Sequence, residues 1–151
     1  MVATSQVSIS DTKLNIDDLS GGFRRKNNLA GAVVIFVGNV RDDHPGGLSL
    51  TLECYVPLAL DRIDMFIREA SSRWDLLSVT IHHRTGKMVP GDEIVFVGVA
   101  SAHRRDAFFA AQFLMDHLKS DAPFWKKQSS SAGSHWVVPR AVDYQDKKSW
   151  N

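Results

Sequence analysis

The stretch MVPGDEIVFVGVAS, Met88–Ser101, contains the local signals that decide the fold. Its Pro-Gly-Asp triplet is typical of a tight turn, and the β-branched and aromatic residues after it are typical of a strand. Another apolar, β-branched run, LLSVTIHHR at Leu76–Arg84, precedes it. Two strands in succession, joined by a short Gly/Pro turn, favour an antiparallel sheet.

Further elements are expected on both sides of this stretch. GAVVIFVG at 31–38 predicts a buried strand, because glycines bound a β-branched apolar run. LSLTLECY alternates, so that its leucines and Cys54 face one side. The patterns predict strands at 31–38, 48–55 and 135–139, and helices from Pro57 to about Trp74 and from about Ala102 to Lys119. We therefore expect an α+β fold with a mostly antiparallel sheet.

The chain of 151 residues is long enough to form one domain with a sizeable hydrophobic core. Residues 1–30 are polar, with a Gly21-Gly22 break, and we expect a partly flexible N-terminal segment before a domain at 31–150. No run is apolar enough to span a membrane, and the N-terminus lacks the features of a secretory signal. Because Cys54 is the only cysteine, the expected location is the cytoplasm, and its place among leucines predicts an inert core thiol.

Charge and motifs exclude several function classes. The net charge of +1 argues against a nucleic-acid binder. Residues 1–100 hold 10 Lys and Arg against 12 Asp and Glu, whereas residues 101–151 hold 8 against 5, which favours a small anionic ligand near the C-terminal part. No spacing typical of a metal site and no nucleotide-binding glycine motif occurs, so neither a metal nor a bound cofactor is expected.

The stretch DHLKSDAPFWKKQ, Asp116–Gln128, places lysines on both sides of an Ala-Pro-Phe-Trp plug. The stripe Arg104, Phe108, Ala111, Met115 and Lys119 has helical spacing and begins and ends with a cation. Ser101 is expected to cap this helix, whose first turn carries two arginines against the helix dipole. Two interpretations remain open, an anion site and an ordinary amphipathic helix with solvated cations.

Longer motifs identify a family resemblance. GAVVIFVGNVR, LTLECY, HRTGKMVPGDEIVFVGVASAHRRDAF and FLMDHLKSDAPFWKK resemble the large, catalytic subunit of molybdopterin synthase. The similarity runs from Gly31 to Lys127, and HWVVPRAVD with Trp150 resembles the family's C-terminal segment. The resemblance implies a hammerhead-type α/β domain with an added small antiparallel sheet and two main helices. It also implies a homodimer that binds two small ubiquitin-like sulfur carriers, forming a heterotetramer.

The activity implied by the resemblance is sulfur transfer. The carrier's Gly-Gly thiocarboxylate would donate sulfur in two rounds to cyclic pyranopterin monophosphate, giving the dithiolene of molybdopterin. Lys119 would be the principal catalytic lysine and Lys126 the second. The implied substrate-binding residues are Asn39, Val40, Arg41, His103, Arg104, Lys119, Lys126, Lys127, Gln128 and Arg140. His103 and Arg104 could act within one chain or across the dimer.

The sequence departs from the family at three places, one of which is the short loop that Arg41 opens. Val56-Pro57-Leu58 replaces a frequent Gly-Met pair, which affects the expected carrier contacts. Asn39 stands where a lysine is frequent, so a contact there is expected through the backbone. The cationic region also leaves two other classes open, a non-catalytic module that binds a phosphorylated ligand or a protein tail, and a structural dimer with a solvated basic face.

Overall fold

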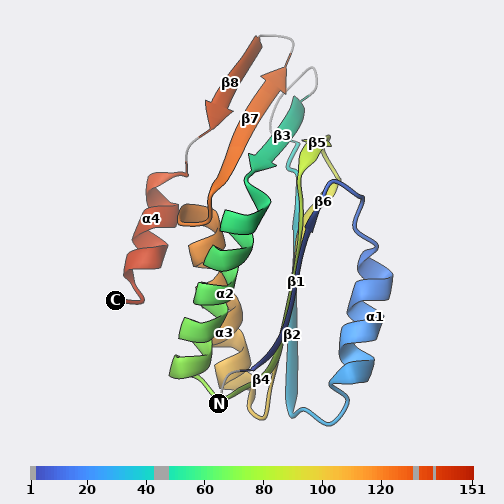
Figure 1. Cartoon of the computed structure of the whole chain (residues 1–151), viewed down its shortest axis with the longest axis vertical. Helices are drawn as coiled ribbons and strands as arrows, with labels where there is room; N and C mark the ends of the chain where they lie inside the picture. The colour runs from blue at the N-terminus through green and yellow to red at the C-terminus, as the bar shows by residue number, and fades with distance from the viewer. Residues whose placement is uncertain (1–2, 43–47, 131–132, 138) are drawn as a thin grey trace.

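The computed structural model describes residues 3–42, 48–130, 133–137 and 139–151. Two four-stranded sheets and four helices make up this part of the chain (Figure 1). The strands are β1 (Thr4–Ser10), β2 (Ala32–Asn39), β3 (Leu48–Cys54), β4 (Leu76–Arg84), β5 (Gly86–Met88), β6 (Glu93–Ser101), β7 (Phe124–Ser130) and β8 (Gly133–Val137). The helices are α1 (Ile16–Lys26), α2 (Val56–Arg73), α3 (Arg104–Ser120) and α4 (Ala141–Lys148). The predicted α+β class is confirmed.

The first sheet has the strand order β1-β4-β6-β2. The predicted pair β4 and β6 forms its centre and is antiparallel, and the turn between β5 and β6 contains Gly91 at a φ of 92°. Only the pairing of β1 with β4 is parallel among the described strands. The prediction of a buried strand at 31–38 is wrong in one respect. β2 is an edge strand and is mostly half-buried, with Phe36 40% exposed.

Helices cover both faces of this sheet, α2 and α3 on one face and α1 on the other (Figure 1). The predicted apolar stripe of α2, including Ile63 and Ile67, is buried, and Pro57 lies in its first turn as expected. The main core joins this stripe to α3 and to the facing side of β4 and β6. Its fully buried members include Ile63, Ile67, Val79, Ile81, Val97, Val99, Ala107, Ala110 and Leu114.

The polar N-terminal segment is packed onto the first sheet. β1 pairs with β4 along seven residues, and α1 runs through the predicted Gly21-Gly22 break. Phe23 of α1 lies on Gly98, where an added Cβ would be 3.0 Å from the ring, and meets the edge of Phe96 at 6.4 Å. Two glycines cost a helix about 2 kcal/mol. Burial of Phe23 and capping by Asn15, whose side chain accepts from the N–H of Asp18, offset that cost.

The start of α3 differs from the prediction by two residues. His103 is the N-cap, and Ser101 is the fully buried last residue of β6. The Ser101 hydroxyl donates to the carbonyl of Asp75 at 2.7 Å and accepts from the N–H of His103 at 3.3 Å. Ser101 therefore joins the end of β6 to the start of β4 rather than capping the helix.

The second sheet, β5-β3-β7-β8, is antiparallel and lies at one end of the first (Figure 1). β7 and α4 were not predicted, since lysines interrupt the apolar pattern of the first and polar residues dominate the second. The predicted last strand is β8, and residue 138 lies outside the described part. The turn-forming residues of NVRDDHPGG at 39–47 and of SSSAG at 129–133 also predict loops. Ser129 and Ser130 instead belong to β7, and residues 43–47 and 131–132 lie outside the described part.

None of the helices in the described part of the chain is long and apolar enough to cross a membrane. The described residues also contain no group of three or more His, Cys, Asp or Glu side chains that could hold a metal ion. Cys54 is partly buried on the apolar side of β3, and burial raises the pKa of its thiol. A thiol with a raised pKa is a poor nucleophile, as expected for a core cysteine.

Candidate functional site

A cavity of about 280 Å³ lies where the ends of β2 and α3 meet β7 and the start of α4. Most of the predicted site residues line it. These are Asn39, Val40, Arg41, Lys119, Lys126, Gln128 and Arg140. The structure thus brings together residues from four separate segments, which local sequence patterns without the family resemblance could not place in one site.

The polypeptide turns sharply between the two lysines, and this turn positions both of them. The N–H groups of Asp121 and Ala122 donate to the carbonyl of His117 at 2.8 and 3.2 Å, which ends α3 just after Lys119. Pro123 cannot continue the helix, and the chain returns as β7, with Lys126 opposite Leu52 of β3. Lys119 is exposed at the end of α3, whereas Lys126 is half-buried on the inner face of β7.

Lys126 has an unusual electrostatic environment. Its pKa is lowered to about 8, mainly by burial and next by the charge of Lys119, with Arg41 acting in the same direction and Asp143 opposing them. An ammonium group that loses water and lies near other cations releases its proton more easily. Lys126 can therefore exchange a proton near neutral pH, which an ordinary lysine cannot do.

Phe124 anchors β7, but Trp125 does not. The ring of Phe124 stacks on His83 of β4 with centroids 4.0 Å apart and an interplanar angle of 14°. Trp125 points to the other side of β7 and is 56% exposed. Of the two aromatic residues in the apolar run at 122–125, therefore, only Phe124 packs against the first sheet. Phe124 lies two residues before Lys126 and on the same face of the strand.

His83 was not predicted as a site residue. It is 7% exposed and contacts the backbone carbonyl of Arg84 through Nδ1 at 3.0 Å. Burial lowers its pKa to about 4, although the Arg84 hydrogen bond acts in the opposite direction, and Lys126 lowers it further. The ring is thus neutral at pH 7. From the sequence, the position of His83 next to His82 in a strand indicated only that the two side chains point to opposite faces.

Lys127 does not line the cavity. It alternates with Lys126, so it lies on the outer face of β7, opposite Thr51 and Trp136. Its Nζ lies 6.0 Å from the ring centroid of Trp136. Within one chain, the structure gives Lys127 no part in the cationic cavity.

His103 and Arg104 are also distant from the cavity. They lie at the first turn of α3, and Lys119 lies in its last turn, about 22 Å away along the helix axis. The predicted stripe is not one surface, because Phe108 is 63% exposed whereas Ala111 is buried. A single chain therefore cannot bring Arg104 and Lys119 to the same ligand.

A second cavity of about 380 Å³ adjoins the first and is more apolar. It shares the side chains of Arg41, Lys119, Lys126 and Arg140 with the first cavity. Its remaining lining includes Phe36, Leu52, His83, Val95 and Met115. The two cavities thus offer a polar chamber and a more apolar chamber that share one set of cations.

The backbone holds the β2 end of the site firmly. A register shift separates Gly38 from Asn39, and the chain then bonds to the turn before β6. The N–H of Val40 donates to the carbonyl of Asp92 at 2.8 Å, and the N–H of Gly91 donates to the carbonyl of Val40 at 2.9 Å. Val40 itself is buried, so Arg41 begins its loop from a fixed point.

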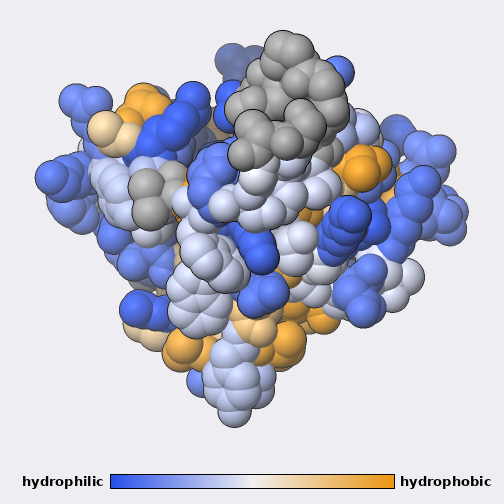
Figure 2. Space-filling model, turned by 90° about the horizontal axis from the view of Figure 1, so that it is seen from above, coloured by the Kyte–Doolittle hydropathy of each residue, from blue (hydrophilic) through white to orange (hydrophobic). Residues whose placement is uncertain are grey.

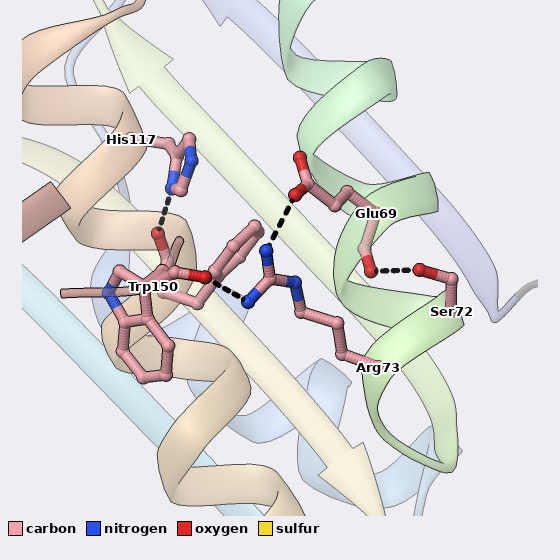
Figure 3. Close-up of polar contacts among 6 residues, drawn as sticks. Glu69, Ser72, Arg73, His117 and Trp150 are labelled. Carbon is pink, nitrogen blue, oxygen red and sulfur yellow. Dashed lines mark hydrogen bonds and ion pairs between the residues drawn. The ribbon is translucent and has the colours of Figure 1, made fainter. Parts of the chain in front are cut away.

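The C-terminal arm, residues 139–151, closes the other side of the cavity and is fastened at Trp150. The indole Nε1–H donates to the Asp116 carboxylate at 2.7 Å, and Arg73 donates to the backbone carbonyl of Trp150 at 2.6 Å. Figure 3 shows the Arg73 guanidinium between Glu69 of its own helix and Trp150. The Trp150 ring packs edge-on against Trp74 and Phe113 at 5.5 and 5.6 Å.

Arg140 and Asp143 are the charged residues of this arm that line the cavity. Arg140 is the N-cap of α4, and its N–H donates to Asp143 at 2.9 Å. Asp143 lines the same cavity and was not predicted as a site residue. Viewed from above, the end of the molecule that carries the second sheet shows mostly hydrophilic and intermediate residues, with small separate hydrophobic areas at several of its edges (Figure 2).

Comparison with known proteins identifies the family. A family model described as MoaE protein matches residues 9–121. The molybdopterin synthase catalytic subunit of Escherichia coli is 49% identical over 122 residues, covering 80% of this chain and 81% of that protein. The structure of the molybdopterin biosynthesis MoaE protein from Burkholderia ambifaria has a TM-score of 0.81 at 35% identity, covering 98% of this chain and 97% of that one.

A third solved structure has the same fold at much lower sequence identity. A complex of subunits 1 and 2 of molybdopterin-converting factor from Helicobacter pylori includes a chain with a TM-score of 0.76 at 18% identity, covering 89% of this chain and 91% of that one. The family match begins at residue 9, so it includes α1, which the motifs from Gly31 onward left out. From the family model and the Escherichia coli relative together, the chain belongs to the MoaE family, that of the molybdopterin synthase catalytic subunits.

Proposed function

We propose that the protein transfers sulfur from the thiocarboxylated C-terminus of a small carrier subunit to cyclic pyranopterin monophosphate, forming the dithiolene of molybdopterin. Membership of the MoaE family supports this role. The observation that carries the proposal is the half-buried Lys126, whose pKa of about 8 and position beside Lys119 suit proton transfer among anions.

The cationic cavity matches the charges of both reactants. The substrate brings a cyclic phosphate and the carrier brings a thiocarboxylate, and sulfur transfer to the substrate develops further negative charge. Lysine and arginine side chains that are already in place stabilise such charge without reorganisation. No cysteine of the protein needs to carry the sulfur, which agrees with the raised pKa of the Cys54 thiol.

The two lysines would have different tasks. Lys119 is exposed at the end of α3, where the carrier's tail can reach it, so we assign it to the thiocarboxylate and the reacting carbon. Lys126 is half-buried and loses its proton near pH 8, so we assign it to proton transfer as well as to anion binding. Arg41, Gln128 and Arg140 would bind the substrate, with Asn39 and Val40 contributing backbone groups.

The paired cavities suit a reaction in which two partners must meet. The polar chamber can hold the phosphate-bearing substrate, and the adjoining chamber, with Phe36 and Met115 in its lining, can hold the carrier's narrow Gly-Gly tail. Their shared cations would then lie between the thiocarboxylate and the substrate. This arrangement requires no metal and no bound organic cofactor.

We further propose that His103 and Arg104 complete the pocket of a neighbouring chain in a homodimer. They are exposed and lie about 22 Å from Lys119, so they can contribute to this chemistry only across an interface. The Helicobacter pylori relative occurs in a complex of two different subunits. A carrier bound to each protomer would give a heterotetramer.

The test is reconstitution with thiocarboxylated carrier and cyclic pyranopterin monophosphate, followed by detection of the dithiolene product. The proposal expects two sulfur atoms transferred per product molecule. Wild-type protein that binds the carrier but yields no product, where another synthase does, would establish the alternative of a non-catalytic binding module.

A further inference from the structure

Asp143 is an acidic side chain in a cavity otherwise rich in cations. Among the described residues that line the cavity it is the only carboxylate, and it faces a site to which Arg41, Lys119, Lys126 and Arg140 contribute. It is 8% exposed, although α4 is otherwise mostly exposed. A buried carboxylate is costly unless hydrogen bonds or charges compensate it, so its position needs a reason.

Part of the compensation comes from α4 itself. The Asp143 carboxylate accepts a hydrogen bond from the backbone N–H of Arg140 at 2.9 Å. The Nε of the Arg140 side chain lies 3.8 Å from the same carboxylate oxygen. Asp143 stands in the first turn of α4, where the helix dipole favours a negative charge. These contacts fix the start of the helix and hold Arg140 at the wall of the cavity.

The rest of the compensation comes from across the cavity. The charge of Asp143 stabilises the protonated form of Lys126, against burial and against the charges of Lys119 and Arg41. Without a substrate, the clustered cations repel one another, and a single carboxylate reduces that repulsion. The charged groups around Lys126 are Arg41 after β2, Lys119 of α3, Arg140 at the start of α4 and Asp143 within it, and the titratable but neutral ring of His83 faces it from β4.

The arm holds this carboxylate in place. α4 is joined to the end of α3 by Lys147, whose Nζ lies 3.5 Å from Asp121, and Trp150 is fastened beyond it. A helix of eight residues has little stability of its own, so these contacts decide where Asp143 lies.

Resting on the proposed function, we propose that Asp143 is a positioning residue of the site, acting as the fixed counter-charge that orients Arg140 and holds Lys126 as a cation until the anionic substrate binds. It does not touch the reacting atoms. Its purely structural alternative is a helix cap, and the two roles differ in a measurable way, because a cap needs only a hydrogen-bond acceptor whereas a counter-charge needs the charge.

The test compares Asp143→Asn with wild type. Asparagine keeps an acceptor for the N–H of Arg140 and removes the charge. Lysines are labelled by reductive ¹³C-methylation, the Lys126 signal is assigned by its loss in Lys126→Arg, and its titration is followed by NMR without carrier or substrate. Asp146→Asn is the matched control, because Asp146 is an exposed carboxylate on the same helix.

The proposal expects the pKa of Lys126 to fall by roughly one unit in Asp143→Asn and to stay unchanged in Asp146→Asn. An unchanged pKa in Asp143→Asn, or equal shifts in the two variants, would overturn it. If Asp143→Asn does not fold, Asp143→Glu and Asp143→Gln replace it, since both lengthen the side chain and only the first retains the charge. Equal Lys126 titrations in that pair would likewise overturn the proposal.

Activity gives a separate readout. In the reconstituted reaction, the limb of the pH–rate profile that follows Lys126 is expected to move to lower pH in Asp143→Asn by the same amount as the NMR titration. A synthase reaction that fails with wild-type protein would reject the proposed function and leave the Lys126 titration to decide on Asp143.

Discussion

The ring of Phe124 lies flat on the ring of His83, with centroids 4.0 Å apart, and this contact joins the second sheet to the first beneath the cationic cavity. Phe124 belongs to β7 and His83 to β4, so the stack fixes the strand that carries Lys126 relative to the centre of the first sheet. The position of Lys126 therefore depends on a contact made two residues earlier in the chain.

Replacing Phe124 by Ala is expected to lower both stability and activity. Loss of the partly buried ring should reduce the free energy of unfolding by about 2 kcal/mol and loosen β7. Denaturant unfolding measures the first effect, and product formation at saturating carrier measures the second. Trp125→Ala is the matched control, because the neighbouring ring is 56% exposed and should cost less than about 1 kcal/mol.

His83 should make the protein less stable in acid. Its pKa is about 4 in the folded protein against 6.5 in the unfolded chain, so the unfolded state takes up the proton first as the pH falls. Stability is fully present above pH 6.5 and is lost progressively down to about pH 4, by on the order of 3 kcal/mol.

Urea unfolding of wild type and His83→Phe between pH 4 and pH 7 measures this effect. The phenylalanine variant should lack the acid-dependent loss of stability that His83 causes. The free energy of unfolding of wild type minus that of the variant should therefore fall between pH 7 and pH 4. His135→Gln, which removes an exposed imidazole, serves as the control. A constant difference across this range would show that His83 does not titrate in this way.

Trp150→Ala should release the C-terminal arm. The substitution removes the hydrogen bond to Asp116 and the ring contacts with Trp74 and Phe113, so we expect a loss of roughly 2–3 kcal/mol and faster amide exchange in α4. Because Arg140 then leaves the cavity wall, KM for the substrate should rise more than kcat falls. Trp150→Phe keeps an aromatic ring and should show a smaller change, and unaltered exchange in α4 for the alanine variant would contradict the role of the arm.

Mixing variants of the proposed homodimer can show whether Arg104 acts across an interface. Lys119→Ala and Arg104→Ala are each expected to be inactive, and re-mixing them should restore about one quarter of wild-type activity. Half of the mixed population is heterodimeric, and one pocket in each heterodimer has both native side chains if Arg104 crosses the interface. No recovery after proven subunit exchange would place Arg104 in the pocket of its own chain, and full activity of Arg104→Ala by itself would place Arg104 outside the reaction.

Local patterns were sufficient for most of the fold and for part of the site. The turn at Pro90 and the spacing of Ile63 and Ile67 depend on neighbours in sequence, and both predictions are confirmed. β7 was missed because Lys126 occupies an inward position where the pattern required an apolar residue. The family resemblance placed Lys127 in the site beside Lys126. The sides that these two lysines face can be assigned only once β7 is recognised as a strand.

The residues that sequence reasoning missed act through distant partners. Asp143 stands in a short polar helix, and only its contact with a cavity formed by β2, α3 and β7 shows that it matters. His83 was visible as one of two adjacent histidines, but its partner Phe124 is 41 positions away. Contacts of this kind leave no local periodicity in the sequence.

We propose that the cations of the cavity, rather than the basic surface as a whole, carry out sulfur transfer. Single-turnover product formation with Lys119→Ala, Lys126→Ala and Lys127→Ala under identical conditions tests this most directly. Lys126 and Lys127 are neighbours on one strand that face opposite ways, so they differ in position and hardly in chemistry. We predict a loss of at least about 100-fold for Lys119→Ala and Lys126→Ala, and less than about threefold for Lys127→Ala. Full activity of either cavity variant, or an equal loss in all three, would contradict the account.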